Sequence, residues 1–198
     1  MPYSQFSIES IQSDLGVRVQ DRSGLFAEVA AIPYSDFLAQ SLKEYSPLAI
    51  AIGTEKSRSE FIIAPILFEL KKQLANQISL FSGKEFNVEP TKGLSGFCDF
   101  LISRSPEQLF IKSPVVTIVE AKNDNILTGI GQCIAEMVAA QIFNERHQNS
   151  ILVIYGVVTT GSLWKFLRLE GALVQVDLDE YYLNDIGKLL GILRYCVV

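Results

Sequence analysis

The sequence has few of the residues that build thiolate metal sites and disulfides. Its 198 residues include one histidine and three cysteines. Cys98, Cys133 and Cys196 are far apart, odd in number and form no CxxC pair, which argues against a zinc site and favours a reducing compartment. The lone His147 follows polar residues at an expected helix end, so we interpret it as a solvated helix-terminal side chain rather than a catalytic one.

Long apolar runs and excess basic charge are also lacking. No apolar run approaches the ~20 residues of a membrane span, and the start "MPYSQFSIES" has neither the basic nor the apolar region of a secretory signal. We therefore expect a cytoplasmic protein that has no membrane partner. The net charge of −5 provides no global basic field for nucleic acid. A metal-dependent site, however, carries its own carboxylates and needs only a local basic rim.

The composition fits one globular domain. A hydrophobic fraction of 48% with 20% charged residues is ordinary, on the apolar side. A chain of this length supports one good core and is short for two. No repeat, low-complexity segment or linker interrupts it, so we expect a single α/β domain over residues 1–198.

Helices dominate the expected first half of the chain. Residues 1–32 are mixed, with room for one or two strands in 16–32. Helices are expected over 33–45, where Ser35 or Asp36 lies in the first turn, and over 57–77, where Ser59 is a plausible cap. Pro65 indicates a kink there, or a helix that starts near residue 64. The run "PLAIAIG", residues 47–53, is interpreted as a short buried strand or turn.

The second half alternates strands with two helices. Expected strands are "KEFNVEPTKG" with its turn, "GFCDFLIS", "VVTIVEAK", "ILVIYGVVTT" as a central strand covered on both faces, and one or two antiparallel strands in 161–178. The longest helix is expected over 125–147, with an apolar stripe at Ile130, Ile134, Met137, Val138, Ile142 and Phe143. Gly129 and Gly131 indicate a close approach of that helix to the sheet or to a ligand. A last helix is expected over 181–195.

Charged residues interrupt the apolar strand "VTIVEAKND" at its end. Residues two apart in a strand share a face, so Glu120 and Lys122 project together and Ala121 leaves its carbonyl available. Asp99 lies within the neighbouring run "GFCDFLIS". Two carboxylates from adjacent strands provide the oxygen ligands that Mg²⁺ or Mn²⁺ prefers. A lysine beside them would act on the attacking water and on phosphate charge.

This pattern of strand, strand and long helix resembles the PD-(D/E)XK nuclease superfamily over about residues 55–170. The resemblance implies a restriction-endonuclease-like core, a central mixed β-sheet flanked by α-helices, with residues 1–54 as an N-terminal elaboration and a C-terminal helix in 181–198. It implies a metal-dependent DNA endonuclease or exonuclease, and a homodimer as in many members. Cys98 stands where the motif has proline.

The resemblance also assigns roles to residues. Asp99 is the motif aspartate, Glu120 the second acid and Lys122 the lysine; Gln132 matches a glutamine frequent on the helix that follows. Magnesium would be held by Asp99, Glu120 and the Ala121 carbonyl. Glu60 matches a frequent early acid that completes the metal cluster. Among basic residues, Lys56, Arg58 and Lys92 are candidate contacts for nucleic-acid phosphates.

Other interpretations remain open at this stage. The chain fits a nuclease fold that has lost catalysis, or needs a partner for it, and that binds DNA or another protein. In an unrelated α/β domain, Glu120 and Lys122 would be a surface ion pair at a strand end. Gln132 and Glu136, one helical turn apart, would then be a solvated stripe.

Overall fold

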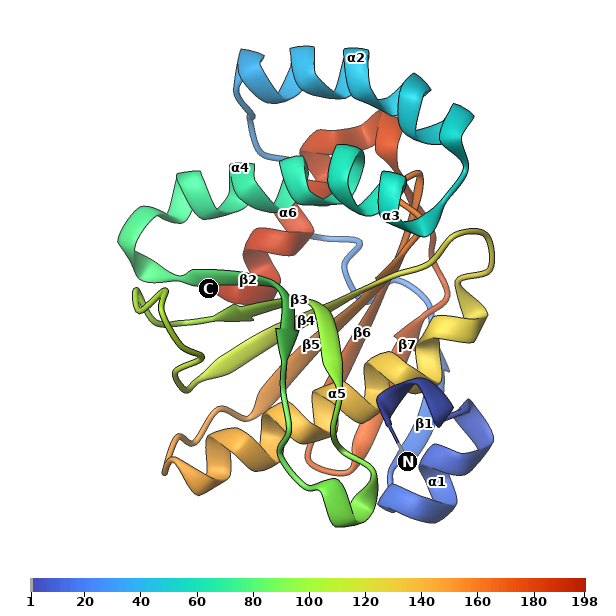
Figure 1. The fold of residues 1–198 in the computed structure, drawn as a ribbon, viewed down its shortest axis with the longest axis vertical. Coiled ribbons are helices and arrows are strands. Elements are labelled where there is room, and N and C mark those ends of the chain that lie inside the picture. The colour runs from blue at the N-terminus through green and yellow to red at the C-terminus, as the bar shows by residue number, and fades with distance from the viewer. Residues whose placement is uncertain (1) are drawn as a thin grey trace.

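The computed structural model describes residues 2–198, which form a mixed eight-stranded β-sheet between two helical layers (Figure 1). The strand order is β1-β7-β6-β5-β4-β3-β2, and β8 pairs with β6. The pairs β1–β7 and β4–β5 are parallel, and the others are antiparallel. The strands are β1 (Arg18–Arg22), β2 (Ser79–Glu85), β3 (Phe97–Ser103), β4 (Val115–Ala121), β5 (Val153–Thr159), β6 (Leu163–Glu170), β7 (Leu173–Asp177) and β8 (Tyr181–Tyr182). The expected α/β class with a mixed sheet flanked by helices is confirmed.

Each face of the sheet has its own helical cover and its own apolar core. Helices α1 (Ile8–Leu15) and α5 (Leu127–Arg146) lie on one face. On the other face lie α4 (Ala64–Leu74) and α6 (Ile186–Val197), with α2 (Asp36–Ile52) stacked outside α4 (Figure 1). Every residue of β4 is buried, as the near-continuous apolar run predicts for a strand covered on both faces. No helix in residues 2–198 is long and apolar enough to cross a membrane.

The prediction for residues 47–53 is wrong, because "PLAIAIG" continues helix α2 as far as Ile52. The buried residues Leu38 and Ala49 are eleven positions apart, about three helical turns, so they lie on one face of the helix. Pro47 removes one backbone hydrogen bond, but it lies on the exposed side, where water replaces the lost donor. Gly53, at φ 69°, closes the helix. Within 47–53 only Ala49 is buried, and Leu48 and Ile52 are half exposed, so this short apolar run is not a buried element.

The helical region around residue 59 also starts earlier than expected. Its N-cap is Thr54, which forms a capping box with Ser57 and begins α3 (Glu55–Arg58). Ser59 is not a cap; it opens a five-residue π-helical segment, Ser59–Ile63. That wider turn leads into α4, which begins at Ala64 and has Pro65 in its first turn.

The strand expected within 84–93 lies earlier, as β2 (Ser79–Glu85), and Pro90–Lys92 forms a 3-10 turn. Further differences lie near the two ends of the chain. Helix α1 was not anticipated, and β1 is the one strand within residues 16–32. The last helix begins at Ile186 rather than Tyr181, because Tyr181 and Tyr182 pair with β6. The expectation for His147 is met, since it is exposed and caps the end of α5.

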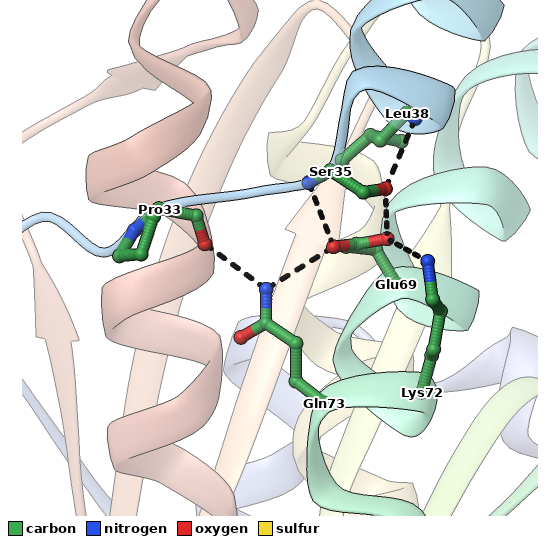
Figure 2. A network of polar contacts seen from close by, with 6 residues as sticks. All are labelled: Pro33, Ser35, Leu38, Glu69, Lys72 and Gln73. Carbon is green, nitrogen blue, oxygen red and sulfur yellow. Dashed lines mark hydrogen bonds and ion pairs between the residues drawn. The ribbon is translucent and has the colours of Figure 1, made fainter.

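A buried carboxylate ties α2 to α4 (Figure 2). Glu69 on α4 is 4% exposed and accepts hydrogen bonds from the Ser35 backbone N–H, at 3.0 Å, and from the Ser35 hydroxyl, at 2.7 Å. Ser35 Oγ in turn accepts from the backbone N–H of Leu38 and caps α2. Gln73 Nε2 donates one hydrogen bond to the Pro33 carbonyl and another to Glu69 Oε1. Burial raises the pKa of Glu69, but the hydrogen bonds from Ser35 and Gln73 and the charge of Lys72 together outweigh it and leave the pKa below its usual value.

We expect Glu69→Ala to destabilise the protein by ~2–4 kcal/mol, because it leaves the start of α2 with unpaired donors and removes charge-assisted hydrogen bonds. The lowered pKa means that the Glu69 contribution is present above the unfolded pKa and is lost as pH falls through the folded pKa. Urea unfolding at neutral and acid pH measures both effects. Glu145→Ala, at an exposed helical position, is the control, and an equal loss in the two variants would refute the role of Glu69.

Candidate metal and phosphate site

Strands β3 and β4 place Asp99 and Glu120 side by side. The antiparallel register pairs Phe100 with Val119, and Asp99 and Glu120 are the next residues of the two strands toward this edge of the sheet. Asp99 Oδ2 accepts a hydrogen bond of 2.8 Å from the backbone N–H of Ala121. The Ala121 carbonyl points to the same side as its N–H, toward Asp99. The two strands that carry the motif residues are therefore paired, as expected.

The Glu120 carboxyl group is buried within this end of the sheet. The residue is 1% exposed; Oε1 pairs with Lys122 Nζ, whereas Oε2 is buried and has no hydrogen-bond partner in residues 2–198. Burial and the charge of Asp99 raise the pKa of Glu120 to about 8, against the opposing effect of Lys122. A surface ion pair at a strand end would be solvated, so that interpretation of "EAK" is wrong.

Lys122 is held between the strand end and helix α5. Its side chain is 18% exposed, and its backbone N–H donates to the Thr159 carbonyl at 2.8 Å. A Cβ atom at Gly129 would lie 3.0 Å from both Cγ and Cε of Lys122 and 2.7 Å from Val158 Cγ1. The absence of a side chain at Gly129 thus allows the expected close approach of the helix to the sheet and makes room for the lysine, whereas Gly131 lies against the backbone of Phe6 and Ser7.

The charge of Lys122 is stabilised by its acidic neighbours. Burial lowers the pKa of the Lys122 amine, but the charge and hydrogen bond of Glu120, with Glu55 and Asp99, outweigh it and raise the pKa above its usual value. Lys122 is therefore an ammonium at neutral pH. It can donate hydrogen bonds and offset negative charge, but it is not poised to accept a proton.

Asp99 and Ala121 line a cleft of about 270 Å³, whose other wall comes from α3 and the π-helical segment. Glu55 is the acid of that wall that is electrostatically coupled to the site. Its partial burial raises its pKa, Lys122 lowers it and Asp99 raises it. The remaining lining residues are Lys56, Ser59, Glu60, Ser82 and Gly83.

The early acid expected at Glu60 lies at the cleft rim. Its side chain is 52% exposed and pairs with Lys56 at 2.7 Å. Glu55 was missed because the helix was expected to begin at residue 57, which left this acid in a loop. The signal for it was Thr54, an N-cap residue directly before an acid in the first turn.

Helix α5 contributes a polar pair. Gln132 Nε2 donates to Glu136 Oε1 at 3.1 Å. Glu136 is fully buried, so the expected solvated stripe is wrong. Burial and the charge of Glu120 raise the pKa of Glu136 well above its usual value. The signal for this burial was the row of small residues on α5, which includes Gly129, Gly131, Ala135, Ala139 and Ala140.

The structure brings one of the three basic candidates to the cleft. Lys56 lines it, paired with Glu60. Arg58 instead donates to the Thr160 carbonyl at 3.1 Å and holds the loop after β5. Lys92 lies in a different hollow, beside Asp14 and Gln141.

Within residues 2–198, no group of three or more His, Cys, Asp or Glu side chains converges as a metal site. The donors at the strand ends nevertheless fit Mg²⁺ or Mn²⁺. Asp99, Glu120 and the Ala121 carbonyl offer oxygen atoms, and Glu120 Oε2 is a buried acceptor that has no partner. Mg²⁺ commonly binds through one or two carboxylates, with waters and substrate phosphates in its other positions.

The raised pKa of Glu120 predicts that the metal-free protein loses stability as pH rises. An unfolded glutamate titrates near 4.5 and folded Glu120 at about 8, so the folded state holds an extra proton between these values. The stabilisation present below the unfolded pKa is then lost as pH rises through the folded pKa. In chelator, we expect the urea midpoint of wild type to fall more steeply between about pH 5 and 8.5 than that of Glu120→Gln, which does not titrate.

The control variant Glu145→Gln should keep the wild-type slope. Equal slopes for wild type and Glu120→Gln would show that the folded protein does not hold a proton on Glu120.

Comparison with protein-family models finds no match for this chain, and comparison with curated proteins finds no significant relative. What can be said of its function therefore rests on the residues and their arrangement.

Proposed function

We propose that this chain is a metal-dependent DNA phosphodiesterase, a nuclease of the PD-(D/E)XK type. The observation that carries the proposal is the contact of Asp99 with the Ala121 N–H, which brings Asp99 to the buried Glu120–Lys122 pair, with a polar cleft lined by Asp99 and Ala121. In this proposal the restriction-endonuclease-like core spans about residues 55–170. A short D…ExK pattern is common in sequences. Far fewer proteins place its acids on two paired strands, so that arrangement is stronger support than the pattern alone.

Asp99, Glu120 and the Ala121 carbonyl would hold Mg²⁺ or Mn²⁺, with Glu55 or Glu60 on the opposite cleft wall. When bound, such a cation supplies Lewis-acid stabilisation of charge on a phosphate group. The chain positions its carboxylates on buried strands, whose rigidity fixes ligands better than a loop does. Mutual repulsion among these acids, seen in the raised pKa of Glu120, favours a divalent cation between them.

Lys122 would act as a fixed positive charge. As an ammonium with three N–H donors, it would donate to a phosphate oxygen or to the attacking water and offset charge in the transition state. Its raised pKa argues against a role as general base. Gln132, on the helix beside it, would orient the same water or phosphate.

DNA binding by this chain would depend on metal. The protein carries a net charge of −5, and the cleft is lined by three acids and one lysine. Phosphates would therefore be repelled until a divalent cation neutralises the site. A homodimer that cuts both strands follows from the same family proposal.

A second candidate is a nuclease-fold protein that binds a partner without catalysis. The observation in its favour is a set of exposed apolar side chains on α2, with Phe37 at 67%, Leu48 at 49% and Ile52 at 49% exposure, because exposed apolar surface marks many protein interfaces. The two candidates differ in their response to metal and in cleavage.

We expect the thermal midpoint of wild type to rise with Mg²⁺ or Mn²⁺ by ligand linkage, about 2.7 kcal/mol of stabilisation at a hundred times the dissociation constant. Asp99→Asn should lose most of this response, because it removes a ligand charge. Asp124→Asn, at an exposed position just beyond the strand, is the matched control. Equal metal responses in wild type and Asp99→Asn would contradict the metal site.

We expect purified wild type to cleave plasmid or linear DNA in Mg²⁺ or Mn²⁺. Lys122→Ala should reduce cleavage by about 10²–10⁴-fold while metal still binds, because the lysine acts on phosphate and water. Glu120→Gln should lose metal response and cleavage together. Lys43→Ala, at an exposed lysine on α2, should keep full activity.

Cleavage by Lys122→Ala at the wild-type rate would identify the activity as a contaminant. DNA binding by a wild type that cuts nothing would favour the second candidate.

A further inference from the structure

Glu136 is an acid in the middle of the buried helix α5. Its neighbours Cys133, Met137 and Ala140 are all fully buried, and so is Glu136 itself. An ionisable side chain in such a layer is costly unless it is paired. Methionine would fill similar space without that cost, so packing alone does not explain an acid here.

The contact that Glu136 makes is with Gln132. Glu136 Oε1 accepts from Gln132 Nε2 at 3.1 Å. A carboxyl oxygen accepts this hydrogen bond in either protonation state. Because the amide nitrogen is fixed on Glu136, the amide oxygen of Gln132 is directed away from it.

The direction away from Glu136 leads toward the proposed site. Gly129, Gln132 and Glu136 lie on successive turns of one helix face, since they are three and four residues apart. Gly129 is the residue over which Lys122 packs. Along this helix face, Gln132 therefore lies between Gly129, against which Lys122 packs, and Glu136.

Glu136 is close enough to the site to feel its charges. The charges of Glu120 and Asp99 raise the pKa of Glu136, and the charge of Lys122 lowers it. Glu136 Oε2 and Glu120 Oε2 are both buried and have no hydrogen-bond partner among the described residues. Glu136 thus stands behind the site, with one oxygen engaged by Gln132.

We propose that Glu136 is a positioning residue that orients the Gln132 amide, so that its carbonyl oxygen faces Lys122 and the reacting phosphate or water. This inference rests on the proposed nuclease function. The amide oxygen then accepts a hydrogen bond from the Lys122 ammonium or the water and holds that group in place. Supports of this kind behind the reacting groups affect activity strongly.

The test compares Glu136→Met, which removes the acceptor, with Glu136→Gln, which keeps an acceptor oxygen at the same place. We expect Glu136→Met to fold with a thermal midpoint at or above that of wild type, since it removes a buried polar group. Its kcat should fall about 10–100-fold, with KM and Mn²⁺ affinity within about threefold of wild type. Glu136→Gln should restore kcat to within about threefold of wild type.

A second measurement is independent of activity. The side-chain amide signal of Gln132 in a ¹H–¹⁵N spectrum, identified by its loss in Gln132→Ala, should shift in Glu136→Met and stay near its wild-type position in Glu136→Gln. An unmoved signal in Glu136→Met would overturn the proposal. So would a wild-type kcat in Glu136→Met, or a failure of Glu136→Gln to restore the rate.

A failure of the proposed nuclease function gives a different result from a failure of the Glu136 proposal. In that case wild type neither binds Mn²⁺ nor cleaves DNA, and the proposed catalytic role falls with it. The Gln132 amide signal would still report whether Glu136 orients that side chain.

Discussion

The antiparallel pairing of β3 with β4 is the constraint on which the candidate site depends. With Phe100 opposite Val119, Asp99 and Glu120 follow at the ends of the paired strands, where Asp99 accepts a hydrogen bond from the Ala121 N–H. A shift of the register by one residue would break this contact, because it exchanges the faces of the shifted strand's side chains. The register is fixed by burial, since Phe100 and Val119 pack in one apolar core and Leu101 and Ile118 in the other. The packing that stabilises the sheet therefore also fixes the geometry of the site.

That geometry concentrates charge where water is scarce. Glu120 and Glu136 are both buried; burial and the charge of Asp99 raise the pKa of Glu120, and burial and the charge of Glu120 raise the pKa of Glu136. Lys122 compensates part of this cost. Such frustrated, partly compensated acids are typical of functional sites, where stability is given up for reactivity. A divalent cation would resolve the repulsion that the chain leaves in place.

Much of the architecture was predictable from sequence because β-branched runs and helical spacing report burial directly. The strand and helix around Glu120 and Gln132 were expected for this reason, and a two-residue spacing in a strand placed Glu120 with Lys122. The helical structure of residues 47–53 was not predicted, because a short apolar run alone does not show whether it continues the helix before it. Glu55 and Glu136 were missed for another reason. Thr54 signals the helix start that holds Glu55, and the small residues of α5 signal the burial of Glu136, but their proximity to Asp99 and Glu120 depends on how α3 and α5 dock on the sheet.

The central claim is that the ends of β3 and β4 bind a catalytic divalent cation. Anomalous diffraction from a Mn²⁺-soaked crystal measures this directly. The account predicts one peak between the Asp99 and Glu120 carboxylates, about 2.0–2.3 Å from an oxygen of each and near the Ala121 carbonyl. Saturating Mn²⁺ that leaves this position without a peak, with Glu120 still paired only to Lys122, would contradict it.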